Sequence, residues 1–98
     1  MDYRVIFTAA FLADLERIVR FIAVRNPSAA RVLGDLIIQK AESLCFFPER
    51  HPKVRQRPGV RRFIVRNYFK VFYRVQTESR TVEVLRCWDG RRHSGPVL

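Results

Sequence analysis

The stretch from Gly59 to Cys87 constrains the fold most, because apolar residues recur at every second position within three of its segments. Residues 60–66, 69–75 and 81–87 are rich in β-branched and aromatic side chains, which is typical of strands. Residues 67–68 and 76–80 connect these segments, and connections this short make neighbouring strands antiparallel. The sequence therefore predicts a three-stranded meander.

The alternation also separates the two faces of the predicted sheet, since successive side chains of a strand point to opposite sides. One face of the first two strands is apolar and consists of Phe63, Val65, Phe69, Val71, Tyr73 and Val75. The opposite face is basic and half apolar, with Arg62, Ile64, Arg66, Lys70, Phe72 and Arg74. We expect the first face to pack on a core, and the function to lie on or beside the second.

Two helices are predicted ahead of the meander. A short strand over residues 3–7 leads to Thr8, a suitable N-cap for a helix that ends near Arg25. Asn26 can cap a second helix, and Pro27 suits its first position, so this helix runs to about Leu44. The link is so short that the two helices form an antiparallel hairpin.

Each predicted helix carries an apolar stripe that indicates its buried side. The first stripe contains Phe11, Leu12, Leu15, Ile18, Val19, Phe21 and Ile22. The polar side of that helix is assigned to Asp14, Glu16, Arg17 and Arg20. The second stripe contains Ala30, Leu33, Ile37, Ala41 and Leu44, and Gly34 permits a close approach between the helices.

The predicted element order is β-α-α-β-β-β, in a single α+β domain over residues 1–98. The helical hairpin must cover the apolar face of an antiparallel sheet, because neither layer can bury its apolar side alone. We expect the first strand at an edge of this sheet or beside the last strand. Residues 46–58 form a loop, and residues 88–98 a tail with a turn at Asp89-Gly90.

The charge of the chain is concentrated in its second half. Residues 1–49 contain six basic and six acidic side chains, whereas residues 50–98 contain thirteen basic and three acidic ones, so the net charge of +10 lies there. Sixteen of the nineteen basic residues are arginine, which binds phosphate and carboxylate through a bidentate fork. This asymmetry favours a polyanionic or acidic partner, and a basic surface kept for solubility is the alternative.

The remaining reactive side chains predict neither a metal site nor a cofactor. Cys45 and Cys87 form no CxxC motif and have no histidine at metal-ligand spacing, so both are expected to be reduced and buried. His51 is more simply a solvated loop histidine than a catalytic one. Neither a signal peptide nor an apolar run of transmembrane length is visible, which predicts a cytoplasmic protein without membrane contact.

Several segments in this order resemble the RelE/ParE superfamily of bacterial type II toxins. They are VIFTAAFLADLERIVRFI, Leu44 with Pro48 four residues later, RRFIV, NYFKVFYRV and VEVLRCWDGRR, and together they cover nearly the whole chain. The C-terminal part is most similar to the ParE side. The resemblance implies the RelE/ParE-like fold, in which an antiparallel sheet packs on a helical hairpin.

The resemblance implies two possible activities. ParE-like members poison DNA gyrase and are not nucleases, and the plasmid stabilisation toxins belong to this side, which is the reading we prefer. RelE-like members cut mRNA in the ribosomal A site without a metal, using basic side chains and a group that transfers a proton. On this chain the RelE positions fall on Arg62, Ile64, Lys70, Arg92 and Leu98. Ile64 and Leu98 lack the required chemistry, although His93 could transfer the proton.

Both activities imply an inhibitory antitoxin, here a ParD-like protein that binds through an amphipathic, acidic segment and forms a hetero-oligomer with the toxin. Target binding is assigned to Arg62, Lys70, Arg74, Arg86, Arg91 and Arg92. Arg86 cannot be assigned to a face from the alternation. Antitoxin binding is assigned to Leu12, Leu15, Ile64 and Phe72. A non-toxic nucleic-acid-binding module and a degenerate toxin that only binds antitoxin remain as alternatives.

Overall fold

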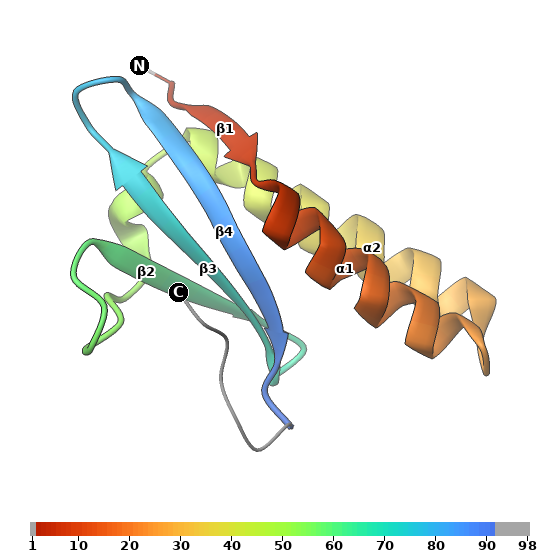
Figure 1. Cartoon of the computed structure of the whole chain (residues 1–98). Helices are drawn as coiled ribbons and strands as arrows, with labels where there is room; N and C mark the ends of the chain where they lie inside the picture. Colours follow the sequence, from red (N-terminus) through yellow and green to blue (C-terminus); the bar gives the residue numbers. More distant parts are fainter. Residues whose placement is uncertain (1, 92–98) are drawn as a thin grey trace.

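The computed structural model describes residues 2–91, which form one helical layer against one sheet (Figure 1). The chain begins with strand β1 (Arg4–Phe7) and helices α1 (Ala9–Ala23) and α2 (Pro27–Glu42). Two 3-10 turns follow, η1 (Ser43–Cys45) and η2 (Pro48–Arg50). Strands β2 (Val60–Val65), β3 (Phe69–Gln76) and β4 (Thr81–Asp89) complete the predicted α+β order.

The meander is present, and the first strand lies where the sequence placed it. The sheet order is β1-β4-β3-β2, with β2, β3 and β4 antiparallel in turn. β1 occupies the edge beside β4, but it runs parallel to β4, so the sheet is mixed rather than wholly antiparallel. A parallel pair requires a long crossover, which the hairpin and the first two meander strands supply.

Each strand differs from the prediction at one end by one or two residues: β1 begins at Arg4, and β3 extends to Gln76. β2 stops at Val65, because Arg66 and Asn67 turn the chain with φ values of 53° and 70°. β4 continues two residues beyond Cys87, to Asp89. Gly90 then turns, as expected, and its N–H donates to the carbonyl of Tyr68 at 2.6 Å. A Cβ at Gly90 would lie 2.8 Å from that oxygen, so this close approach requires glycine.

Both helices begin as predicted. The Thr8 hydroxyl accepts a hydrogen bond from the N–H of Phe11 at 3.1 Å, and the Asn26 side chain accepts one from Ala29 at 3.1 Å. α2 ends at Glu42, and the chain continues to Cys45 as η1. A Cβ at Gly34 would lie 3.2 Å from a methyl group of Val19, which confirms the close contact between the helices.

The core lies between the hairpin and one face of the meander. The inward residues of β2 and β3 predicted from the alternation line it, and Val82, Val84 and Cys87 of β4 join them. Two predicted core residues of α1 are instead exposed, namely Leu12 (47%) and Phe21 (70%). Asp14, which was assigned to solvent, is 2% exposed. The buried stripe is therefore rotated towards Asp14, because α1 packs against the edge of β4 as well as over the sheet.

A basic sheet face and an apolar groove

The outer face of the meander carries cationic side chains in ordered rows. The strand register places Arg62, Phe72 and Arg86 across the sheet in one row. A second row contains Ile64, Lys70 and Trp88, and a third contains Val60, Arg74 and Glu83. Directly opposed side chains of antiparallel strands are neighbours on the same face. The predicted basic face therefore exists, with Phe72 between two arginines.

Three of these cations have no acidic partner among residues 2–91. Arg62, Lys70 and Arg74 are half-buried, and the ion pairs of this region involve other bases. Glu83 lies opposite Arg74 in the register, but its Oε1 accepts a hydrogen bond from Gln76 at 2.9 Å, and no ion pair joins it to Arg74. The positive charge of Arg62, Lys70 and Arg74 is thus available to an external anion.

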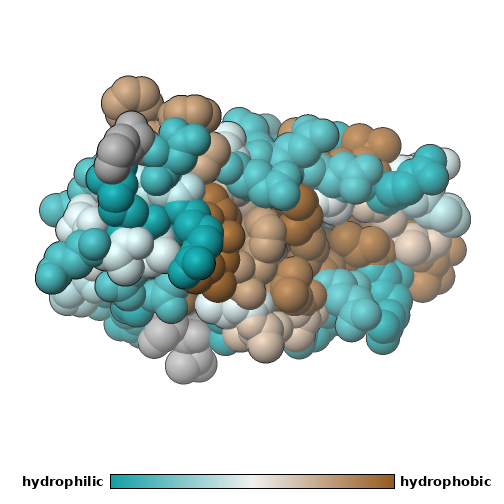
Figure 2. Space-filling model, turned by 90° about the horizontal axis from the view of Figure 1, so that it is seen from above, coloured by the Kyte–Doolittle hydropathy of each residue, from teal (hydrophilic) through white to brown (hydrophobic). Residues whose placement is uncertain are grey.

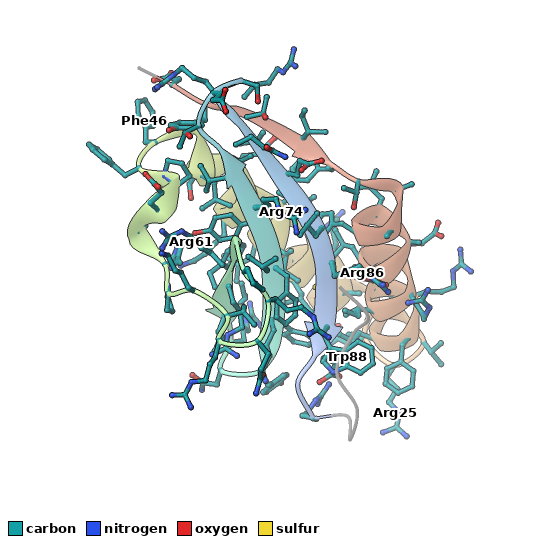
Figure 3. The ribbon with its side chains drawn as sticks, turned by 60° about the vertical axis from the view of Figure 1, so that its left-hand side comes forward. Arg25, Phe46, Arg61, Arg74, Arg86 and Trp88 are labelled. Carbon is teal, nitrogen blue, oxygen red and sulfur yellow. The ribbon has the colours of Figure 1, made fainter. Side chains whose placement is uncertain are left out.

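Arg86 has a different environment from the other three. Its Nε donates to Oδ2 of Asp14 at 2.7 Å, and its Nη2 donates to Oδ1 at 2.9 Å. Figure 3 shows the Arg86 side chain directed towards α1. The register of β3 with β4 shifts between Phe72 and Tyr73, leaving Leu85 as an extra residue in β4. This bulge breaks the simple alternation, which is why the sequence could not assign Arg86 to a face.

Asp14 also completes the backbone pairing of the β4 edge. β1 ends at Phe7, opposite Val84, so the remainder of this edge lacks a neighbouring strand. The N–H of Cys87 donates to Asp14 at 3.1 Å, and the Thr8 hydroxyl donates to the carbonyls of Val84 and Leu85. The side chains of Asp14 and of the N-cap residue Thr8 therefore make hydrogen bonds with the β4 backbone that a neighbouring strand would otherwise make.

The pKa of Asp14 reflects this environment. Burial raises it, but hydrogen bonds from Arg86, from the Cys87 N–H and from Arg17 outweigh that effect, so the pKa is lowered overall. The carboxylate is therefore ionised at neutral pH. Asp14 and Arg86 form a structural ion pair, and Arg86 is accordingly left out of the target surface that we propose below.

Of the functional residues predicted at the end of the chain, Arg91 is among the described residues and the others are not. Arg91 forms a bidentate pair with Asp89, at 2.9 and 2.6 Å, and its guanidinium lies 4.3 Å from the ring centre of Tyr68. Arg92, His93 and Leu98 lie outside the described residues. Of the five RelE positions, only Arg62, Ile64 and Lys70 can therefore be placed, and all three lie on the outer face.

The groups that could transfer a proton lie mostly on the core side. The His51 ring packs against Phe63 and Tyr73, and burial, Arg50 and Lys40 lower its pKa, so it is not the freely solvated histidine expected. Burial raises the pKa of Tyr73 to about 12, and its hydroxyl donates to the carbonyl of Pro48 at 2.6 Å. Burial likewise raises the pKa of Cys87 to about 12, so this thiol is not a nucleophile.

Three further expectations from the sequence concern Cys45, a metal site and membrane-spanning segments. Cys45 is a free thiol as predicted, but it is half-buried rather than buried. Within residues 2–91, no three histidine, cysteine or acidic side chains gather closely enough to hold a metal ion. In the same part of the chain, neither helix has the length and apolarity that crossing a bilayer demands.

Two of the four predicted antitoxin contacts are exposed and two are not. Leu12 and Ile64 are 47% and 43% exposed, so both can contact a partner. Leu15 and Phe72 are 8% and 5% exposed and cannot serve as surface anchors. Leu15 is turned into the core with Phe11, and Phe72 is buried although it lies on the outer face.

An apolar groove of about 660 Å³ lies between the tip of the helical hairpin and the lower end of the sheet. Leu33 and Phe69 are its buried residues, while Phe21 of α1 and Val24, the C-cap residue of α1, are 70% and 84% exposed. Three arginines complete the lining: Arg25, Arg66 and Arg91. The groove is thus apolar with a cationic margin.

Sequence reasoning missed this groove, because Phe21 was placed in the core stripe. A signal was nonetheless present, since the apolar pattern of α1 continues through Val24 to the end of the hairpin. Apolar surface also gathers elsewhere. Seen from above, Figure 2 shows a band of apolar surface that extends towards the hairpin end between two hydrophilic margins. Apolar patches of this kind are typical of protein-binding surfaces.

A hairpin of two helices on a four-stranded mixed sheet is the fold of the RelE/ParE-like toxins. The sequence profile described as "ParE toxin of type II toxin-antitoxin system, parDE" matches residues 5–93. The chain therefore belongs to the ParE toxin family of type II toxin–antitoxin systems. No match was found among curated proteins.

Solved structures of both branches of the superfamily share the fold. A chromosomal ParDE toxin–antitoxin system from P. aeruginosa matches with a TM-score of 0.77 and 21% identity, over 89% of this chain and 95% of that one. The RelBE2 complex from Mycobacterium tuberculosis has a TM-score of 0.64 and 24% identity, over 91% and 92%. A mutant of E. coli RelE in the free state has a TM-score of 0.67 and 16% identity, over 91% and 84%.

Proposed function

We propose that this toxin inhibits growth by poisoning DNA gyrase, and that a cognate ParD-like antitoxin neutralises it in a hetero-oligomer. One observation carries the proposal, namely the outer sheet face, where Arg62, Lys70 and Arg74 lack acidic partners among the described residues. Such a surface can bind an acidic protein or DNA phosphate and can steer the encounter. Membership of the ParE family supports the same target.

Among residues 2–91, the outer face has no histidine or tyrosine in its three rows, and this supports binding over catalysis. Cleavage of RNA through the 2′-hydroxyl requires a proton acceptor near the stabilising cations. In the three rows described above, Glu83 is the only carboxylate, and Gln76 donates to it. Histidine and tyrosine are absent from these rows, because His51 and Tyr73 lie on the core side.

The second candidate function is a ribosome-dependent mRNA nuclease. The observation in its favour is that Arg62 and Lys70, two basic positions of the RelE pattern, lie on the outer face in the adjacent strands β2 and β3. On this candidate His93 would transfer the proton.

We further propose that the toxin acts in the cytoplasm, where its target is located, and that its gene pair contributes to plasmid stabilisation. The cytoplasmic location holds for either candidate target, whereas plasmid stabilisation goes with the preferred ParE-like function.

The proposal is tested by reversing charge on the outer face. Purified toxin, released from its antitoxin, is added to gyrase and supercoiled plasmid, and the trapped cleavage complexes are counted. We expect Arg62→Glu and Arg74→Glu to reduce the complexes at least tenfold, because each replaces a half-buried cation of the binding face with an anion. Arg31→Glu is the matched control, since this exposed arginine lies on α2 and the substitution changes the net charge equally. Equal activity of all three variants would contradict the proposal.

A further inference from the structure

Two adjacent phenylalanines, Phe46 and Phe47, project from the turn that joins η1 to η2, and we call them the aromatic turn. Phe46 is 55% exposed, and Phe47 is 83% exposed, the highest value for an aromatic side chain among residues 2–91. They lie outside both the apolar groove and the three rows of the outer face. In Figure 3, Phe46 lies at the margin of the molecule on the side away from α1, as does Arg61. The aromatic turn is therefore a separate surface feature.

The backbone of Phe47 has a conformation that its side chain disfavours. Its φ and ψ are 45° and 57°, in the left-handed region, where the Cβ of an L-residue crowds the following carbonyl oxygen. Glycine or asparagine adopts this conformation more readily. Because the ring is exposed, burial does not offset the cost. Folding therefore gains little from a phenylalanine here, and strain of this kind is typical of positions that contact a ligand.

The backbone of the aromatic turn is held in place by two arginines. Nη1 of Arg50 donates to the carbonyls of Phe46 and Phe47, at 2.5 and 3.2 Å. Nη1 of Arg61 donates to the carbonyl of His51 at 2.8 Å, which ties the end of η2 to β2. The two rings are thus presented on a fixed backbone, and this lowers the conformational entropy that a ligand loses with them on binding.

Cations flank the aromatic turn. Residues 40–61 contain six basic and two acidic side chains. Lys53 lies opposite Arg61 in an antiparallel bridge, so it is close to the segment that Arg61 ties down. Burial, and then the positive charges of Arg50 and Lys40, lower the pKa of His51, so both cations act on the end of η2. Four of the bases are exposed and form no ion pair with a carboxylate of residues 2–91, namely Lys40, Lys53, Arg55 and Arg57.

Exposed aromatic rings beside unpaired cations match the chemistry of a single-stranded nucleic acid. Unpaired bases stack on aromatic side chains, and the phosphates between them bind lysine and arginine. We propose that the aromatic turn, with the cations of residues 40–61, is a binding site for single-stranded DNA. The choice of DNA over RNA rests on the proposed function, because gyrase acts on DNA. The site would give the toxin a contact with the DNA of the gyrase complex in addition to its outer face.

The experiment measures binding of the purified toxin to a labelled oligothymidylate of about 12 nucleotides by fluorescence anisotropy. An abasic strand of the same length has the same phosphates but no bases. We expect the parent toxin to bind the oligothymidylate at least about fivefold more tightly than the abasic strand, because bases stack on the rings. An oligouridylate of equal length is the RNA arm, and tighter binding of that strand through Phe47 would overturn the assignment to DNA.

Phe47→Asn tests the stacking directly, since asparagine accepts a φ of 45° without loss of stability. It is expected to lower the affinity for oligothymidylate at least about fivefold and to leave the affinity for the abasic strand unchanged. Phe21→Asn is the matched control, because Phe21 is 70% exposed and lies in the apolar groove instead. Arg55→Glu/Arg57→Glu should weaken binding of both strands and reduce its salt dependence. Thermal melts establish that each variant is folded.

The DNA site and the gyrase target fail in different assays. If the parent binds both DNA strands equally, or if Phe47→Asn binds oligothymidylate as tightly as the parent does, the site is overturned and the gyrase proposal stands. A toxin that binds oligothymidylate through Phe47 but traps no gyrase complexes would refute the target and leave the site in place. Phe47-dependent binding to vesicles of an acidic phospholipid, without any preference for bases, would show that the aromatic turn contacts lipid and would also overturn the site.

Discussion

Truncation of Asp14 should destabilise the fold more than any other change to a charged side chain of α1. Asp14→Ala leaves the buried N–H of Cys87 without an acceptor, which costs about 1–3 kcal/mol. It also removes one ionic partner of Arg86, whose side chain is 27% exposed and remains partly hydrated, so we expect less than the ~3–5 kcal/mol of a fully buried pair. Arg17 adds little, because its side chain is 65% exposed.

These contributions together predict a loss of about 2–4 kcal/mol in the free energy of unfolding, against a total of ~5–15 kcal/mol for a folded domain. In a domain of this size, each kcal/mol shifts the melting temperature by about 4–8 °C. Thermal and urea unfolding, followed by circular dichroism, should therefore show a fall of roughly 10–25 °C. Asp14→Asn should lie between parent and Asp14→Ala, since the amide keeps an acceptor for the Cys87 N–H.

The control is Glu16→Gln on the same helix. Glu16 pairs with Arg20, and both side chains are about two-thirds or more exposed, so this substitution should change stability by less than about 0.5 kcal/mol. A double-mutant cycle with Arg86→Met isolates the pair itself. The reasoning is refuted if Asp14→Ala is as stable as Glu16→Gln, because Asp14 would then hold neither the β4 edge nor Arg86.

Three further predictions concern stability. The pKa of Asp14 is lowered in the folded state. The stability that its carboxylate contributes is therefore complete above its unfolded pKa of about 4 and is lost as pH falls through the folded pKa. Acid titration should abolish the difference in the free energy of unfolding between parent and Asp14→Asn. Tyr73→Phe should cost about 1–2 kcal/mol in urea unfolding, because the buried hydroxyl donates to Pro48; an unchanged midpoint would mean that this hydrogen bond is unimportant. Phe47→Gly should raise the melting temperature, since Phe47 has a φ of 45° that costs a non-glycine residue about 1–2 kcal/mol, and a lower melting temperature would count against backbone strain there.

The local elements were predictable because short-range rules determine them. The period of two in residues 59–87 defined three strands and their core face, and Thr8, Asn26 and Pro27 defined the helix starts. Gly34 indicated where the helices touch. The layer arrangement followed from the need of the hairpin and the sheet to bury their apolar sides against each other, the family resemblance implied it as well, and the fold confirms it.

What the sequence did not predict depends on contacts between distant segments. The bulge at Leu85 rotates Arg86 relative to a simple alternation, and no local pattern marks that position. Asp14 has the spacing of a solvated polar residue and is buried only because β1 is too short to cover the β4 edge. Phe21 has the spacing of a core residue and is exposed because the sheet ends before the hairpin does.

The choice between gyrase and the ribosome is tested most directly with the unaltered toxin. Purified toxin is added in parallel to gyrase with supercoiled plasmid and to a translating ribosome extract with labelled mRNA. We predict trapped gyrase cleavage complexes and intact mRNA. Codon-aligned cuts in the mRNA with gyrase unaffected would contradict the account and make the outer face a catalytic surface.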